Sequence, residues 1–206
     1  MSQLNVKITF TEEVLGTTSG DPELFDNFIA SKAPNAKTRE EEIANYGAEN
    51  VAASKMTVFN KQNGVPFLYD YQIKGFFKDA CSMLARVAAK DENGKKIPCN
   101  ESSKLKAYKK VIDGMIFVQP RKIMLDLHGK ELGNCQRPLR AQTMQGERVT
   151  LASSETAPAG TTCSFTIMCL SDEHLKAVEE WLNYGRLRGI GQWRNGSKGT
   201  FIWSKE

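Results

Sequence analysis

The 206-residue chain has no long apolar run, no closely paired cysteines and almost no histidine. No stretch reaches the roughly 18 to 20 apolar residues that a membrane-spanning helix needs, so we expect no contact with a bilayer. The first seven residues also lack the charged-then-apolar pattern of a signal peptide. The five cysteines include no Cys-x-x-Cys pair, which fits a reducing cytoplasm better than a disulfide framework or a zinc site. We therefore expect a cytoplasmic protein without metal or cofactor.

Catalytic residues are equally scarce. His128 and His174 are the only histidines, and neither has a recognisable partner in the sequence. A solvent-facing histidine explains both. Gly-x-Ser-x-Gly, Walker and His-Glu-x-x-His motifs are absent. The sequence predicts a protein that is not an enzyme, with a histidine-dependent endoribonuclease as an alternative.

Acidic residues are missing from residues 181–205, although the whole chain carries 24 of them. Residues 1–50 hold nine acidic and four basic residues, whereas residues 51–206 hold 15 acidic and 24 basic ones. The net charge of +4 therefore understates the positive character of the main body. Such a distribution indicates a polyanionic partner.

The segment 185–199 concentrates this charge, with five glycines, four basic residues and Trp193. Glycine permits close backbone approach to a ligand, and arginine and lysine side chains suit phosphate oxygens. A tryptophan in the middle offers a face on which a base could stack. Gly-rich segments between a helix and a strand are also often plain connectors, and Trp193 could cap the core. The composition favours nucleic-acid binding.

Apolar spacing predicts a single α+β domain over 1–206 with a mostly antiparallel sheet. Strands are expected at 4–10, 56–59, 65–69, 111–118, 122–127, 161–170 and 200–203. Helices are expected at 21–30, 38–48, 72–89 and 172–184. The first two helices form an acidic insertion or arm over 20–56, and the polar segment 90–104 is expected to be a mobile loop.

Two segments resemble the RAMP (repeat-associated mysterious protein) superfamily, which includes backbone and processing subunits of CRISPR effector complexes. Residues Val58–Phe77 resemble its V-x-x-x-x-x-G-x-P-Y-I-P-G-S-S-L-K-G-x-x-R region, and Ser154–Ile167 resemble its E-x-I-P-A-G-x-x-F-x-F-x-I strand. The later helix, Gly-rich loop and final strand follow in the family's order. The resemblance implies a ferredoxin-like core, akin to the RNA-recognition motif, with a helical insertion after the first strand. It also implies subunits that stack along a guide RNA and hold its phosphates.

The resemblance carries over to particular residues and departs at others. Lys74 and Gly75 match the helix-opening Lys-Gly, where a cation lies beside free N–H groups. The small hydroxyl residues of the P-G-S-S element are replaced at 69–72, where Asp70 would repel a phosphate or cap the helix. Residues 52–57 lack the aspartate of the subunits that cleave a target, which argues against that cleavage.

We therefore expect a non-catalytic, RAMP-like protein that grips the backbone of single-stranded RNA or DNA, with RNA preferred through the resemblance. It could act as a stacking subunit, by self-association or with CRISPR-type protein partners. The alternative is an interaction module from a phage or other mobile element that mimics a CRISPR backbone subunit and binds protein or a small nucleotide, docking through acidic residues 38–49. The predicted nucleic-acid-binding residues are Lys74, Gly75, Arg137, Arg140, Arg148, Arg186, Arg188, Gly189, Gly191, Trp193, Arg194, Lys198 and Gly199.

Overall fold

The computed structural model describes residues 1–19, 56–87, 89–143 and 146–206. The acidic insertion predicted over 20–56, with its helices at 21–30 and 38–48, lies outside these residues except for Met56. The described residues form a mixed α+β structure with mostly antiparallel sheets, as the sequence predicts.

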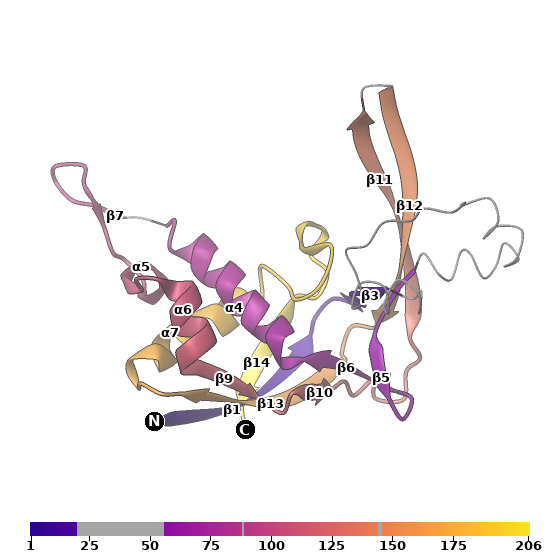
Figure 1. Cartoon of the computed structure of the whole chain (residues 1–206), viewed down its shortest axis with the longest axis horizontal. Helices are drawn as coiled ribbons and strands as arrows, with labels where there is room; N and C mark the ends of the chain where they lie inside the picture. Colours follow the sequence, from indigo (N-terminus) through magenta and orange to yellow (C-terminus); the bar gives the residue numbers. More distant parts are fainter. Residues whose placement is uncertain (20–55, 88, 144–145) are drawn as a thin grey trace, which may run out of the picture.

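The main sheet has four strands in the order β14 (Phe201–Lys205), β1 (Ser2–Phe10), β13 (Thr162–Cys169) and β9 (Ile116–Gln119). Every neighbouring pair is antiparallel. The first strand of the chain is therefore central, and it pairs with the last strand on one side (Figure 1).

The two faces of this sheet differ because side chains alternate along each strand. In β1, Leu4, Val6, Ile8 and Phe10 are buried, whereas the residues between them are partly or fully exposed. The same alternation runs along β13 and β9. One face therefore forms the core, and the other is polar.

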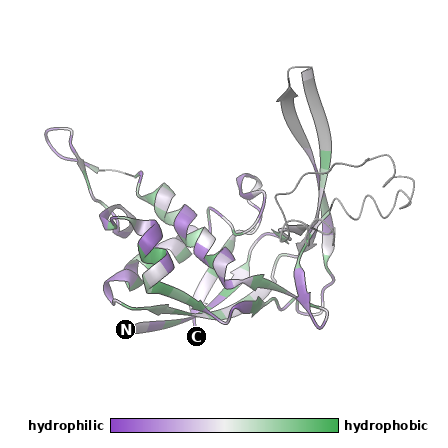
Figure 2. Ribbon diagram, in the orientation of Figure 1, coloured by the Kyte–Doolittle hydropathy of each residue, from purple (hydrophilic) through white to green (hydrophobic). Residues whose placement is uncertain are grey.

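Four helices lie over the buried face (Figure 1). They are α4 (Asp70–Leu84), α5 (Glu101–Lys104), α6 (Tyr108–Met115) and α7 (Glu173–Tyr184). The helices mix hydrophobic and hydrophilic residues, as amphipathic helices on a sheet do (Figure 2). The rings of Phe77 in α4 and Trp181 in α7 lie 5.5 Å apart, and the Trp181 indole N–H donates to the Ser102 hydroxyl at 2.9 Å. The two longest helices are thus joined directly above the sheet.

The remaining strands form smaller sheets beside this core. One contains β10 (Lys122–Met124), β6 (Val65–Tyr69) and β5 (Asn60–Gln62). Another runs in the order β11 (Gly133–Thr143), β12 (Gly146–Ala157), β4 (Met56–Val58) and β3 (Thr18–Ser19), with β2 (Val14–Leu15) pairing β12. The hairpin β11–β12 rises far above the body of the molecule (Figure 1). A short hairpin of β7 (Ala89–Lys90) and β8 (Lys96–Ile97) completes the described strands.

Most of the predicted elements are present, with shifts at their ends. The strand predicted at 161–170 is β13, and the helix predicted at 172–184 is α7. The helix predicted at 72–89 starts earlier, at Asp70, and ends at Leu84. The Tyr69 N–H donates to the Gln72 side chain at 2.7 Å, which satisfies a free backbone group at this helix start.

Two predictions along the chain are wrong. Residues 111–118 were expected as one strand but divide into the end of α6 and β9. An apolar run of this kind fits both periods, since Tyr108, Ile112 and Met115 also have helical spacing. The segment 90–104, expected as a loop, contains part of the β7–β8 hairpin and α5. The Asn100 side chain accepts a hydrogen bond from the Ser103 N–H at 2.8 Å and so caps α5.

No helix in the described ranges is long and apolar enough to cross a membrane.

We predict that Ile8→Ala lowers the free energy of unfolding by about 2–5 kcal/mol, because Ile8 is fully buried between the sheet and the helices. Lys7→Ala, one residue away on the polar face, serves as the control and should change stability by less than about 0.5 kcal/mol. Urea denaturation of both variants measures the difference. Equal effects at the two positions would contradict the assignment of faces.

Candidate nucleic-acid interface

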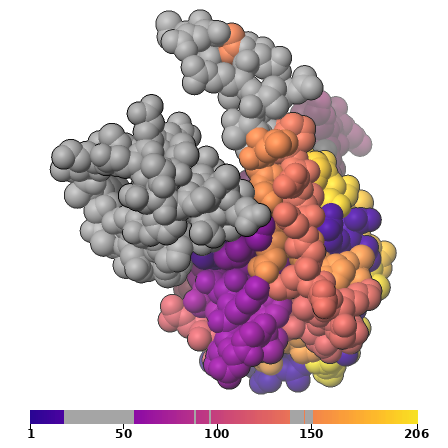
Figure 3. Space-filling model, turned by 90° about the vertical axis from the view of Figure 1, so that its right-hand side faces the viewer, coloured from indigo at the N-terminus to yellow at the C-terminus, as the bar shows by residue number. Residues whose placement is uncertain are grey.

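The Gly-rich segment between α7 and β14 folds back on itself and onto the N-terminal strands. The Ile190 N–H donates to the Gly199 carbonyl at 2.9 Å, and the Gly199 N–H donates to the Glu13 carbonyl at 2.8 Å. A short 3-10 turn, η1 (Arg194–Gly196), forms its tip. These backbone bonds hold the cationic segment beside the base of the β11–β12 hairpin, as Figure 3 shows with the segment in yellow and the hairpin in orange.

Two glycines of this segment serve its own packing. Gly199 has φ +70°, and a Cβ there would lie 2.0 Å from the Ile190 carbonyl oxygen. A Cβ on Gly189 would lie 2.2 Å from the Lys198 carbonyl oxygen. Both residues are buried, so their lack of a side chain lets two stretches of loop backbone meet. The sequence prediction had assigned this property to the approach of a ligand.

Acidic side chains hold three of the four predicted loop cations. The Asp79 carboxylate in α4 accepts hydrogen bonds from Arg188 Nε at 2.7 Å and from Arg194 Nη1 at 2.8 Å. Lys198 Nζ lies 2.6 Å from Glu13 Oε1 and 3.7 Å from Glu12 Oε2. The hydrogen bond to Asp79 is the main cause of a raised pKa at Arg188. That to Glu13 likewise raises the pKa of Lys198.

Arg137 reaches the same segment from β11. Its Nη2 donates to Gln192 Oε1 at 2.8 Å, and the Gln192 amide donates in turn to the Gly16 carbonyl at 3.1 Å. Nε and Nη1 of Arg137 are buried and have no hydrogen-bond partner among the described residues. A buried guanidinium that is only partly paired is costly, so the arrangement favours an anion that completes its bonds.

A cavity of about 360 Å³ opens beside this guanidinium. The loop tip and the hairpin form its walls, and the lining residues are Arg137, Arg188, Gly191, Gln192, Trp193, Arg194 and Asn195. Two of its three arginines, Arg188 and Arg194, pair with the Asp79 carboxylate, and Arg137 has no ion pair with a described carboxylate, which leaves an excess of positive charge. We call this the Arg137 cavity.

Trp193 lies at the surface and does not cap the core, since 41% of its area is exposed. Two cationic side chains lie close to its ring. The Arg137 guanidinium lies 5.4 Å from the ring centroid, and Lys198 Nζ lies 6.0 Å from it. Gly196 packs against the ring as well, because a Cβ there would lie 2.8 Å from Trp193 Cε2. Trp193 therefore holds two cations in place in addition to offering exposed aromatic surface.

The other predicted residues are spread more widely. Arg186 is exposed in the loop. Arg140 lies on β11 and Arg148 on β12, and the structure describes the backbone of these two residues but not their side chains. Lys74 lies in the second turn of α4 and does not line the Arg137 cavity. Its Nζ donates to the Asp113 carbonyl at 3.3 Å. Gly75 is exposed on the same helix, with no atom within 4 Å of an added Cβ.

His128 has partners that sequence reasoning missed. Its Nδ1 lies 3.3 Å from Asp126 Oδ2, and its Nε2 lies 3.1 Å from the Thr162 hydroxyl. The close spacing of Asp126 and His128 was visible in the sequence, but Thr162 arrives through a bridge between distant segments. For His174, in the first turn of α7, the structure places no hydrogen-bonding partner on the ring among the residues it describes. The same residues include no group of three or more side chains that could hold a metal ion.

No protein-family model and no curated protein matches the chain. Among solved structures it is similar to a protein of the type III-B Cmr-beta complex bound to cognate target RNA, at a TM-score of 0.49 over 99% of this chain. The chain spans 58% of that protein. It is also similar to Cmr6 from Pyrococcus furiosus, covering 98% of this chain and 97% of that one, and to a type IV-B CRISPR complex protein, covering 100% and 90%. Both have a TM-score of 0.48, and all three proteins are 11% identical to this chain.

These neighbours are RAMP-type CRISPR proteins, the class that the sequence motifs resemble. The likeness concerns the path of the backbone. At this identity and these TM-scores it transfers no site residue and no function to this chain.

We predict that Gly199→Ala destabilises the protein by more than about 1–2 kcal/mol, the cost of a left-handed conformation for an L-residue, because the new methyl group also meets the Ile190 carbonyl. Gly75→Ala is the matched control, since its Cβ enters open space on a helix and should stabilise by up to about 1 kcal/mol. Thermal denaturation compares the two. A neutral Gly199→Ala would mean that the loop is not packed as described.

Proposed function

We propose that this chain is a non-catalytic protein of RAMP-like fold that grips the phosphate backbone of a single-stranded nucleic acid. RNA is proposed over DNA because the motifs resemble proteins that hold a guide RNA. The carrying observation is the partly paired Arg137 guanidinium beside the Gly-rich loop. A cytoplasmic location accords with five free thiols.

The ferredoxin-like core is part of this proposal. Numbered along the chain, β1, β9, β13 and β14 are the first to fourth strands of the main sheet, and they lie in the spatial order 4-1-3-2. Helix α4 lies between the first and second of these strands, and α7 between the third and fourth. This order supports a ferredoxin-like βαββαβ core, with β10, β11 and β12 inserted between the second and third strands.

Charge and shape at the Arg137 cavity suit a phosphate. A guanidinium donates charge-assisted hydrogen bonds to phosphate oxygens, and here Nε and Nη1, which lie on different edges of the group, are both unpaired among the described residues. Asp79 orients Arg188 and Arg194 around the same cavity. The loop arginines thus shape a positive rim, and Arg137 makes the direct contact.

The exposed part of the Trp193 ring would provide a second kind of contact, by stacking on a base. Because two cations already lie near its ring, a base that stacks there adjoins the Arg137 and Lys198 charges. Base stacking tolerates any sequence, and phosphate contacts carry no base information. The Arg137 cavity therefore supports binding without sequence preference.

We predict that Arg137→Ala weakens binding of a fluorescein-labelled 12-nucleotide U-rich RNA about tenfold or more, since a hydrogen bond to a charged group contributes about 1.5–3 kcal/mol. Fluorescence polarisation at fixed salt measures the affinity. Arg86→Ala is the control, because it removes the same charge from an exposed position without a hydrogen bond or ion pair to a described side chain. If both variants bind like the wild-type protein, the cavity does not hold the backbone.

One observation favours the endoribonuclease alternative. The His128 imidazole contacts the Asp126 carboxylate through Nδ1 and the Thr162 hydroxyl through Nε2. A carboxylate that orients an imidazole is typical of a general base. However, both the imidazole and the carboxylate are half exposed or more, and neither residue lines the Arg137 cavity. We retain binding as the function.

We predict that the wild-type protein and His128→Ala leave 5′-labelled RNA equally intact through a long incubation, as judged on a denaturing gel. Products ending in a 2′,3′-cyclic phosphate that form with the wild type and vanish with His128→Ala would establish the nuclease instead.

The interaction-module alternative rests on acidic residues 38–49, which lie outside the described part of the chain. Freshly purified protein that carries protein partners but no absorbance excess at 260 nm would favour it.

A further inference from the structure

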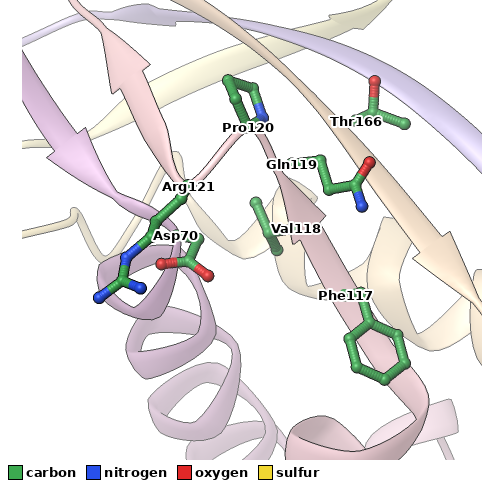
Figure 4. A pocket seen from close by; sticks show the side chains of 7 residues that line it. All are labelled: Asp70, Phe117, Val118, Gln119, Pro120, Arg121 and Thr166. Carbon is green, nitrogen blue, oxygen red and sulfur yellow. The ribbon is translucent and has the colours of Figure 1, made fainter.

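A second cavity, of about 650 Å³, opens at the start of α4 (Figure 4). The first residue of the helix, the strand β9, the turn into β10 and one residue of β13 form its walls. The lining residues are Asp70, Phe117, Val118, Gln119, Pro120, Arg121 and Thr166. The Arg137 cavity shares none of these residues.

Two opposite charges stand unpaired in this second cavity. Neither the Asp70 carboxylate nor the Arg121 guanidinium makes a hydrogen bond or ion pair with a side chain of the described residues. Their backbones are tied together, since the Asp70 N–H donates to the Arg121 carbonyl at 2.9 Å. Both side chains therefore keep their bonding capacity for a ligand while their positions are set. Figure 4 shows them together on one side of the cavity.

The opposite side offers an aromatic ring and an amide. Phe117 and Gln119 belong to β9 and point to the same side of the strand (Figure 4). Phe117 is 39% exposed, although both of its neighbours in the strand are buried. Lys74 Nζ lies 5.0 Å from the centre of its ring. A flat apolar surface, a hydrogen-bonding amide and one guanidinium therefore line the cavity together with one carboxylate, and Lys74 lies beside the aromatic ring.

The carboxylate decides which ligand fits. Asp70 repels a phosphate, so a phosphate cannot bind at the carboxylate itself, whereas a base with two adjacent donors can reach both carboxylate oxygens. Guanine presents N1–H and its 2-amino group side by side on its Watson–Crick edge, and the other common bases present no such pair of donors. Recognition by that edge, together with aromatic stacking, is the usual way in which proteins read single-stranded RNA.

We propose that this cavity binds a guanine base, with Asp70 accepting from N1–H and the 2-amino group and Phe117 supporting the ring. Arg121 and Lys74 hold the phosphate attached to that nucleotide. The proposal extends the nucleic-acid-binding role given above, because it adds base selection to a backbone grip. Helix α4 connects the two sites: Asp79, the anchor of the loop arginines, lies nine residues after Asp70, or about 13 Å along the axis.

The experiment compares three 12-nucleotide RNAs by fluorescence polarisation: all-uridine, the same strand with two central guanosines, and that strand with inosine in their place. Inosine lacks only the 2-amino group. The wild-type protein should prefer the guanosine strand about tenfold over the other two, the size expected for one bidentate base contact. Asp70→Asn should remove this preference, so that the guanosine and inosine strands bind alike. Glu131→Gln, an equal loss of charge at an exposed site, should retain the preference.

Equal binding of the guanosine and inosine strands by the wild-type protein would overturn the proposal. An Asp70→Asn effect of the same size on all three strands would also overturn it. Calorimetric titration with guanosine 5′-monophosphate and inosine 5′-monophosphate separates this site from the backbone grip. If no RNA binds but the guanosine nucleotide alone does, and Asp70→Asn abolishes that binding, the base site stands while the proposed function fails.

Discussion

The structure depends on the central position of the first strand. β1 pairs with β13 along one edge and with β14 along the other, so the first and last strands of the chain lie side by side at one end of the sheet. The segment that precedes β14 is held by the chain that follows β1, through the bond from the Gly199 N–H to the Glu13 carbonyl. The position of the cationic loop is therefore a consequence of strand pairing.

Within that loop, three of the four basic side chains form ion pairs with acidic residues of the same chain. Asp79 gathers Arg188 and Arg194, and Glu13 holds Lys198. A side chain from a distant hairpin, Arg137, then supplies a guanidinium whose bonding is incomplete. The candidate site is composite, because the loop provides the shape and β11 provides the free hydrogen-bond donors.

The sequence predicted the parts with strong local patterns. Alternation over residues 4–10 and helical spacing in α4 and α7 correspond to real elements, because each buries one apolar face. The division of 111–118 between α6 and β9 could not be predicted, since an apolar run of that length fits a helix or a strand. The length of the hairpin β11–β12 could not be predicted either, because its polar residues carry little hydrophobic signal.

For the site, composition directed attention to Arg137 and Trp193, and the structure places both at one cavity. It could not reveal that Asp79 and Glu13 neutralise neighbouring cations, since those contacts join residues more than 100 positions apart. The central claim, that a positive cavity grips phosphates, is tested most directly by the salt dependence of RNA binding. The account predicts that log K falls linearly with log[salt], with a slope of about −0.7 for each phosphate neutralised. An affinity that stays constant from low to high salt would contradict it.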